Sequence, residues 1–135
     1  MPRRERGPIY AAGIIERVDN DLLIALPPSE PDAARLWVFP RGRARDDESP
    51  EAAMRRIAQE QLGLTVEVVV GQPPVREAID GATVEIRYFF CGIIEGVPAT
   101  GAYAELRWIS RAHLREYEFD AASRKVVDWL IENRS

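Results

Sequence analysis

The sequence predicts a single α/β domain built on a mixed β-sheet. Three observations indicate this class: β-leaning apolar runs recur along the chain, a well-capped helix interrupts them near the middle, and an amphipathic helix follows them. A chain of 135 residues has the size of one domain and can bury about two-thirds of its unfolded surface. Because we find no repeat, linker or low-complexity tract, we expect one domain over residues 1–135.

The first part of the chain is predicted to be a hairpin followed by a short strand. Apolar residues dominate Ile9–Val18 and Leu22–Leu26, and the turn-forming residues 19–21 lie between them. Residues 27–32 contain three prolines and should form a surface loop. We expect Arg35–Phe39 to be the next strand, because a proline and a glycine soon follow it.

The middle of the chain carries the clearest helix signals. Ser49 is a good N-cap, Pro50 suits the first turn, and Glu51 complements the positive end of the helix dipole. The helix should end near Leu62, because Gly63 tolerates the left-handed backbone that stops helices.

The second half is predicted to alternate strands and loops and then to end in helices. The last helix is amphipathic, since Val126, Val127 and Leu130 recur at spacings that share one face. The predicted elements are strands at Leu64–Val70, Val75–Ile79, Val84–Ile94 and Glu105–Ile109, a loop over 96–103, a short helix from a Ser110 cap to Arg115, and a helix over Ala121–Glu132.

Composition excludes several classes of function. The net charge of −4 gives the whole molecule no attraction for nucleic acid or anionic membrane, so we expect neither as a partner. No apolar run reaches the roughly 18 residues that span a membrane, and the charged N-terminal residues lead into no signal-peptide core. Cys91 is the only cysteine, which rules out an intrachain disulfide. We therefore expect a cytoplasmic protein with a small-molecule ligand, and the oligomeric state stays open.

One spaced motif gives the sequence its functional signal. After Trp37-Val38-Phe39-Pro40-Arg41-Gly42, the framed positions are Glu48, Arg56, Glu60, Gly63 and Leu64. This frame resembles the box of the Nudix pyrophosphohydrolases, which reads Gly, five residues, Glu, seven residues, Arg-Glu-hydrophobic-x-Glu-Glu-x-Gly-hydrophobic. The downstream segments Arg87–Phe90 and Glu105–Trp108 and the final helix also resemble the family, so the resemblance spans nearly the whole chain.

The resemblance implies a fold, a reaction and a cofactor. The implied fold is a mixed sheet sandwiched between helices, and the implied reaction is hydrolysis of a nucleoside diphosphate linked to another moiety. The Trp-x-Phe-Pro-Arg-Gly segment and the aromatic strand resemble those of short dinucleoside polyphosphate hydrolases. The family holds Mg²⁺ or Mn²⁺ on the helix and the glycine carbonyl, which here implies Gly42, Glu60 and Gln61 as the metal residues.

The box has lost two of its three clustered carboxylates. Ile57 stands where a Glu is expected and offers no oxygen, while Gln61 offers one neutral oxygen. Magnesium is usually held by one or two carboxylates together with water and phosphate oxygens, so Glu60 alone is a poor anchor for several ions. We therefore expect metal binding to be weak or absent, with Glu60 as the catalytic ligand that remains.

Other charged residues have a functional and an ordinary interpretation. Arg41 and Arg43 flank the glycine and are candidates for gripping phosphate, with Arg41 favoured. Glu48 and Arg56 are expected to brace the loop against the helix; otherwise they are two separate surface charges. For the general base we favour Glu105, with Glu77 and Asp80 as alternatives, each of which is otherwise a surface acid.

Two functions from different classes remain open at this level. The first is a Nudix-type hydrolase with weakened activity, which the surviving Glu48, Arg56 and Glu60 favour. The second is a catalytically inactive module that binds a nucleotide or a protein, which Ile57 and Gln61 favour. Trp37, Tyr103 and Trp108 are candidates for stacking on a base, although aromatic side chains more often pack in a core.

Overall fold

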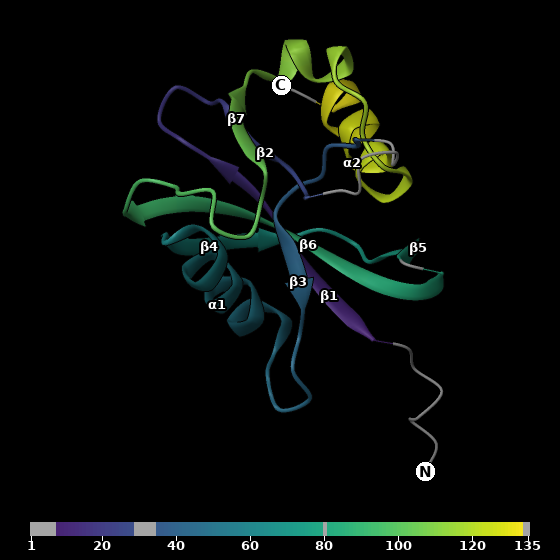
Figure 1. Ribbon diagram of the computed structural model, residues 1–135. Helices are drawn as coiled ribbons and strands as arrows, with labels where there is room; N and C mark the ends of the chain where they lie inside the picture. Colours follow the sequence, from purple (N-terminus) through teal and green to yellow (C-terminus); the bar gives the residue numbers. More distant parts are fainter. Residues whose placement is uncertain (1–7, 29–34, 80, 134–135) are drawn as a thin grey trace.

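The structure is a computed structural model that describes residues 8–28, 35–79 and 81–133. A seven-stranded sheet crosses the molecule, with one long helix on each side of it (Figure 1). The elements are β1 (Ile9–Glu16), β2 (Leu22–Leu26), β3 (Arg41–Arg43), α1 (Pro50–Leu62), β4 (Thr65–Gly71), β5 (Val75–Ile79), β6 (Ala82–Glu95), β7 (Glu105–Ile109), the 3₁₀ helix η2 (Arg111–Glu116) and α2 (Ala121–Glu132).

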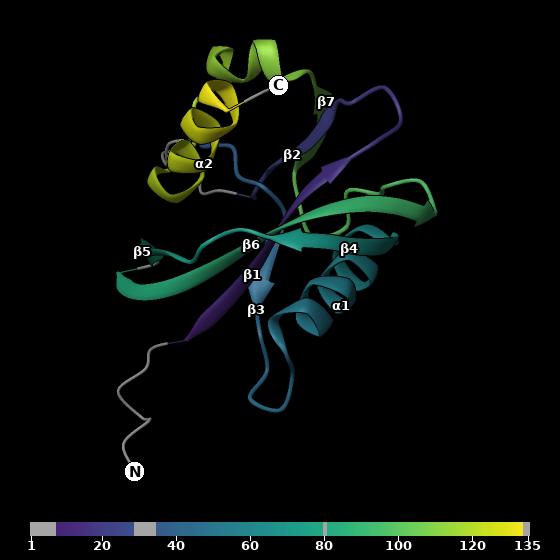
Figure 2. The ribbon, with the colours of Figure 1, turned by 180° about the vertical axis from the view of Figure 1, so that it is seen from behind.

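The sheet is mixed, as predicted. Its main path is β4-β6-β1-β2-β7, with β3 added on β1 and β5 added on β6. The β1–β6 pair is parallel and the other strand pairs are antiparallel. The view from behind shows β6 as the long strand that β4 and β5 flank at different points (Figure 2).

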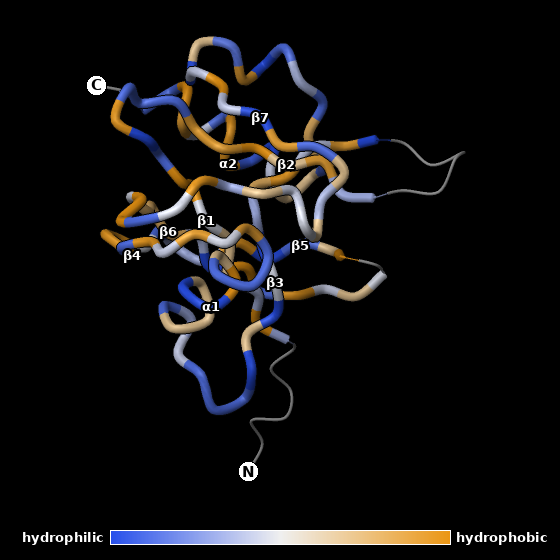
Figure 3. Tube along the Cα trace, turned by 60° about the vertical axis from the view of Figure 1, so that its left-hand side comes forward, coloured by the Kyte–Doolittle hydropathy of each residue, from blue (hydrophilic) through white to orange (hydrophobic). Residues whose placement is uncertain are grey.

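Alternation along the central strand divides the core into two layers. Ala12 and Ile14 of β1 pack in the cluster beneath α2, whereas Ala11 and Ile15 pack in the cluster beneath α1. Figure 3 shows the same division in colour, with apolar colour along the strands and hydrophilic colour along the loop between β3 and α1. None of the described helices is long and apolar enough to cross a membrane.

The predicted helix ends are confirmed. The Ser49 side chain accepts a hydrogen bond from the Ala52 N–H, and Gly63 has a left-handed backbone with φ of 71°. The helix predicted over Ala121–Glu132 has those bounds, and the Asp120 side chain caps it by accepting from the Ser123 N–H.

The hairpin is also confirmed, and its turn is tight. Arg17 N–H donates to the Asp21 carbonyl, and Asn20 between them has a left-handed backbone with φ of 71°. Residues 29–32 of the predicted loop lie outside the described residues. The strands of the second half occupy their predicted positions to within two residues, and Cys91 is buried, which raises the pKa of its thiol to about 12.

Two predicted elements differ from the structure. Arg35–Phe39 is not a strand: Val38 forms one bridge to Ala25, and Trp37 forms one bridge to Phe119. The pairing of Val38 with Ala25 does not continue as a ladder, because Pro40 has no N–H to donate. The short helix after Ser110 is a 3₁₀ helix, and the Ser110 hydroxyl lies 3.0 Å from His113 Nδ1 instead of capping a backbone N–H.

Candidate active site

The motif forms a tight junction between β3 and α1. Gly42 faces the helix, where a Cβ would lie 3.0 Å from two Ile57 carbons and 3.2 Å from Gln61 Nε2. A larger residue would have to push these side chains away, so glycine permits this close approach. The predicted capping of α1 then fixes which of its side chains face the loop.

Glu48 and Arg56 are in contact, as the sequence led us to expect. The Arg56 guanidinium donates to both Glu48 oxygens, at 2.6 and 2.9 Å, and to the Arg43 carbonyl at 3.0 Å. The Arg45 N–H also donates to Glu48. These hydrogen bonds, Arg56 first, lower the pKa of Glu48 to about 2. We call the Glu48–Arg56 pair the charged brace.

Glu60 is exposed and already faces positive charge. Its carboxylate accepts a hydrogen bond from Arg56 at 3.1 Å and lies 3.7 Å from the Arg45 guanidinium. The side chain is 54% exposed, so these ion pairs are largely solvated. Of the two acids that the motif retains, Glu60 is therefore the one that a ligand can reach.

Gln61 joins a closed hydrogen-bond network. Its Nε2 donates to the Arg41 carbonyl at 3.1 Å, and its Oε1 accepts from the Tyr103 hydroxyl at 2.6 Å. The same hydroxyl accepts from the Arg41 N–H at 3.1 Å. We call this set, the Gln61 amide, the Tyr103 hydroxyl and the Arg41 peptide groups, the neutral clasp.

Ile57, at a position where the family resemblance implies a metal ligand, is a core residue and does not line an open cleft. It is 2% exposed and packs with the cluster between α1 and the sheet. The reason is the close approach of Gly42, which leaves no space above the side chain.

The side chains present do not fit a cluster of divalent cations. Ile57 has no oxygen, and the Gln61 oxygen already accepts a hydroxyl proton. Glu60 alone offers a reachable carboxylate, and it faces two guanidinium groups. Over residues 8–28, 35–79 and 81–133, no three His, Cys, Asp or Glu side chains gather in a way that could hold a metal ion. The Mg²⁺ chemistry implied by the resemblance therefore has no built site here.

Arg41 and Arg43 lie in different surroundings. The Arg41 guanidinium pairs with Asp120 at 2.8 Å, so it lies at the start of α2 on the face of the sheet opposite α1. Its side chain is 16% exposed, whereas the Arg43 side chain is exposed. The structure thus does not bring Arg41 and Glu60 into one cluster of side chains.

Buried polar atoms gather near Arg41. Three side-chain atoms in the described part of the chain are buried without a hydrogen-bond partner: Arg41 Nη1, the Tyr88 hydroxyl and Ser123 Oγ. Burial raises the pKa of Tyr88 to about 12, although the nearby Arg41 charge opposes this shift. The Tyr88 hydroxyl lies near both Ser123 and Arg41, so the three groups form one buried polar cluster.

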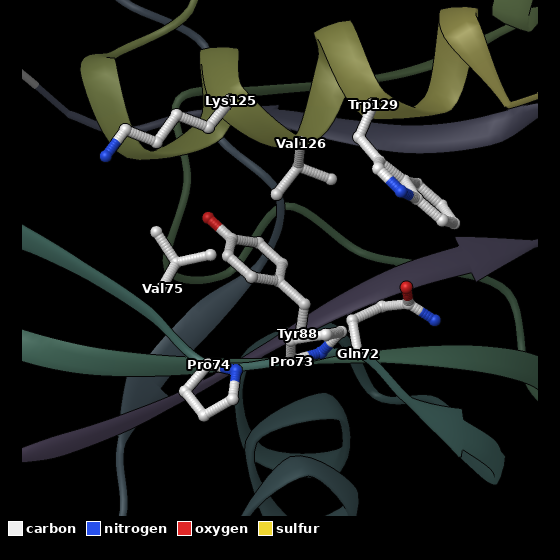
Figure 4. A pocket seen from close by; sticks show the side chains of 8 residues that line it. All are labelled: Gln72, Pro73, Pro74, Val75, Tyr88, Lys125, Val126 and Trp129. Atoms are coloured by element: carbon white, nitrogen blue, oxygen red, sulfur yellow. The ribbon is translucent and has the colours of Figure 1, made fainter.

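A pocket opens beside this cluster, between α2 and the sheet. Its volume is about 230 Å³. Figure 4 shows the Tyr88 ring rising from β6 towards the helix, with Trp129 and Val126 above it. The lining residues are Gln72, Pro73, Pro74, Val75, Tyr88, Lys125, Val126 and Trp129.

The candidate bases are not gathered at the junction. Glu105 forms its ion pair with Arg107 at 2.7 Å, and Glu77 pairs with Lys125 of α2. Asp80 lies outside the described residues. Among the described side chains, no hydrogen bond or ion pair links Glu105 to the loop before α1 or to α1.

Most of the candidate stacking residues have partners within the protein. Trp37 makes an edge contact with Tyr117, and the Arg17 guanidinium lies 4.6 Å from the Trp108 ring centre. The sequence suggests only stacking for Tyr103, whereas the structure shows its hydroxyl in hydrogen bonds at the junction. No sequence signal indicates the hydrogen bonds of Tyr103 or the buried positions of the Tyr88 and Ser123 polar groups, because tertiary packing creates them.

Comparisons with known proteins agree with the fold. A family model described as NUDIX domain matches residues 7–130. The CTP pyrophosphohydrolase of Escherichia coli strain K12 is 30% identical over 126 residues, which cover 92% of this chain and 91% of that protein. An 8-oxo-dGTP diphosphatase of Proteus vulgaris is 39% identical over 56 residues, covering 42% of this chain and 50% of that protein. The solution structure of the E. coli ORF135 protein superposes with a TM-score of 0.80 at 25% identity, covering 100% of this chain and 96% of that one.

Proposed function

Because this chain belongs to the Nudix family, we propose that it is a slow Nudix-type pyrophosphohydrolase of a nucleoside diphosphate linked to another moiety. The observation that carries the proposal is the retained junction: the charged brace holds the loop, and Glu60 exposes its carboxylate beside it. Nucleoside triphosphates are the first substrates to test, because the relatives named above act on CTP and 8-oxo-dGTP. Dinucleoside polyphosphates are the second class, from the resemblance of the segment Trp37–Gly42 and of the aromatic strand to short hydrolases of these compounds.

The pocket beside α2 supports a nucleotide as the ligand. Its walls are mainly apolar, and Tyr88 lines it with its ring and points its buried hydroxyl towards α2. Stacking of a base on an aromatic side chain contributes about 1–3 kcal/mol, and Trp129 is 42% exposed at this site. Arg41 connects the two regions, since its side chain lies near Tyr88 and its peptide groups belong to the neutral clasp.

Slow turnover is the physical expectation. A cation in a hydrolase of phosphates activates water and neutralises developing charge, and this junction presents one carboxylate where the family has three. We assign no catalytic step to a cation here. Glu60 is the proposed catalytic residue of the junction, Arg43 the proposed phosphate contact, and Glu105 a base candidate without support from its contacts.

A second function has its own supporting observation. The Gln61 amide and the Ile57 side chain are both accommodated without a ligand, the first by hydrogen bonds and the second by core packing. A module that binds a nucleotide and does not cleave it is therefore the alternative proposal.

One assay distinguishes the two proposals. The protein is incubated with CTP, diadenosine tetraphosphate, ADP-ribose and NADH in Mg²⁺ or Mn²⁺, and product release is measured. We expect slow turnover that Glu60→Gln abolishes and that the matched control Glu51→Gln, in the first turn of the same helix, retains. Binding of CTP without product formation, in wild type and in both variants, would support the inactive module instead.

A further inference from the structure

The neutral clasp connects three separate segments of the chain. Arg41 comes from the strand before the loop, Gln61 from the last turn of α1, and Tyr103 from the loop between β6 and β7. Each donor has one acceptor within 3.1 Å: the Arg41 N–H reaches Tyr103, the Tyr103 O–H reaches Gln61, and the Gln61 amide reaches the Arg41 carbonyl. The ring of hydrogen bonds is therefore complete without any further group.

The loop that carries Tyr103 is fitted to the end of α1. Gly96 and Gly101 have left-handed backbones, and a Cβ on them would lie 2.7 Å from the Gly63 carbonyl and 2.8 Å from the Gln61 carbonyl. The Ala99 N–H donates to the Leu62 carbonyl at 3.0 Å. Since backbone atoms cannot move aside easily, only glycine allows the loop to lie this close. The clasp is thus held in place by the backbone as well as by its own hydrogen bonds.

The polarity of the clasp is opposite to that of a cation site. A divalent cation needs free oxygen lone pairs, whereas Gln61 presents its N–H to the Arg41 carbonyl. The Gln61 oxygen faces the Tyr103 proton, and Ile57 fills the space beside it. A cation placed between the loop and the helix would have to break both hydrogen bonds.

We propose that the neutral clasp replaces a divalent cation in joining the loop to α1, so that Gln61 and Tyr103 are positioning residues of a cation-independent junction. The carboxylates nearby need no cation either, because Glu48 and Glu60 face the guanidinium groups of Arg56 and Arg45. The inference takes its site from the proposed function, but its test requires no turnover. A cation bound to a nucleotide could contact only the exposed Glu60 carboxylate, which lies outside the clasp.

The test measures the melting temperature with excess EDTA and with millimolar Mg²⁺ or Mn²⁺. Wild type is expected to melt at the same temperature in all three. Gln61→Glu places a carboxylate oxygen against the Arg41 carbonyl, so it is expected to melt several degrees lower in EDTA and to recover when Mg²⁺ is added. Gln59→Glu, an exposed position on the same helix, is the matched control and is expected to respond to no cation.

A second variant separates this role from simple packing. Tyr103→Phe keeps the ring and removes the hydroxyl, so it is expected to lower the melting temperature without creating any response to cations. Mn²⁺ binding to wild type is measured in parallel by paramagnetic relaxation of water protons, which stays informative if Gln61→Glu fails to fold.

Three results would overturn the inference. The first is a wild-type melting temperature that rises with Mg²⁺, and the second is Mn²⁺ bound to wild type and lost in Gln61→Met. The third is a folded Gln61→Glu variant that melts like wild type with and without cations. None of these depends on product formation, so the proposed function can fail in its own assay while this inference stands.

Discussion

The contact between α1 and the loop before it has two regions that are built differently. In the first region, charged side chains make the contacts: Arg56 donates to Glu48, to Glu60 and to the Arg43 carbonyl. In the second, no charge takes part: Ile57 packs under Gly42, and Gln61 bonds to Tyr103 and to the Arg41 peptide. The charged region keeps Glu48, Arg56 and Glu60 of the family frame. The neutral region keeps Gly42 but has Ile57 and Gln61 where the family has Glu.

A metal-binding helix usually has two roles: it positions the loop beside it, and it supplies metal ligands. In this protein the two regions separate these roles. The charged brace positions the loop and needs only an acid and an arginine eight residues apart. The neutral region lies where the family resemblance implies metal ligands, and it is complete as hydrogen bonds and packing. Positioning of the loop is thus retained where two of the implied metal ligands are absent.

The strongest test of this comparison is a substitution that places a charged side chain in the neutral region. Ile57→Glu is expected to lower the free energy of unfolding by about 4 kcal/mol, because it removes a buried alkyl group and places a carboxylate in an apolar cluster. Urea denaturation at neutral pH measures the change. The control Ile57→Leu keeps the volume and should cost about 1 kcal/mol. A loss below about 1 kcal/mol for Ile57→Glu would show that position 57 faces an open cleft.

The next largest expected loss of stability comes from replacing Arg56 in the charged region. Arg56→Ala leaves the Glu48 carboxylate, which is 14% exposed, without its bidentate partner, and it also frees a loop carbonyl. We expect a loss of about 2 kcal/mol, between the values for surface and buried ion pairs. Arg55→Ala, the exposed neighbour on the same helix, should change stability by less than about 0.5 kcal/mol. Similar small losses for both variants would reduce the brace to ordinary surface charges.

Local chemistry explains why some elements could be predicted from the sequence. Ser49 and Gly63 determine the ends of α1 through contacts within the helix itself, and both ends were predicted. The same holds for α2, where a stripe of apolar residues matches the buried face. The fold class followed from these elements, and the family match supports it.

Tertiary contacts explain what the sequence did not predict. The direction of Arg41 depends on Asp120, far away in the chain, and the burial of Ile57 depends on how closely Gly42 approaches α1. The role of Tyr103 depends on how its loop lies against the end of α1. No spacing rule encodes these three contacts, because each joins separate elements. Motif spacing therefore predicted the helix of the candidate site, but it did not predict the contacts that its side chains make there.

The smallest predicted effect uses pH to test the charged brace alone. The folded-state pKa of Glu48, about 2, lies below its ordinary value of 4.5, so the brace stabilises the fold fully above pH 4.5 and loses this contribution as the pH falls towards 2. Glu48→Gln is expected to cost on the order of 1 kcal/mol at pH 7, after allowance for solvent screening, and the difference from wild type should shrink through that window. Urea denaturation at a series of pH values measures it, with Glu51→Gln as the exposed control. A difference that stays constant from pH 7 to the acid limit would mean that the Glu48 carboxylate holds the loop through shape and not through charge.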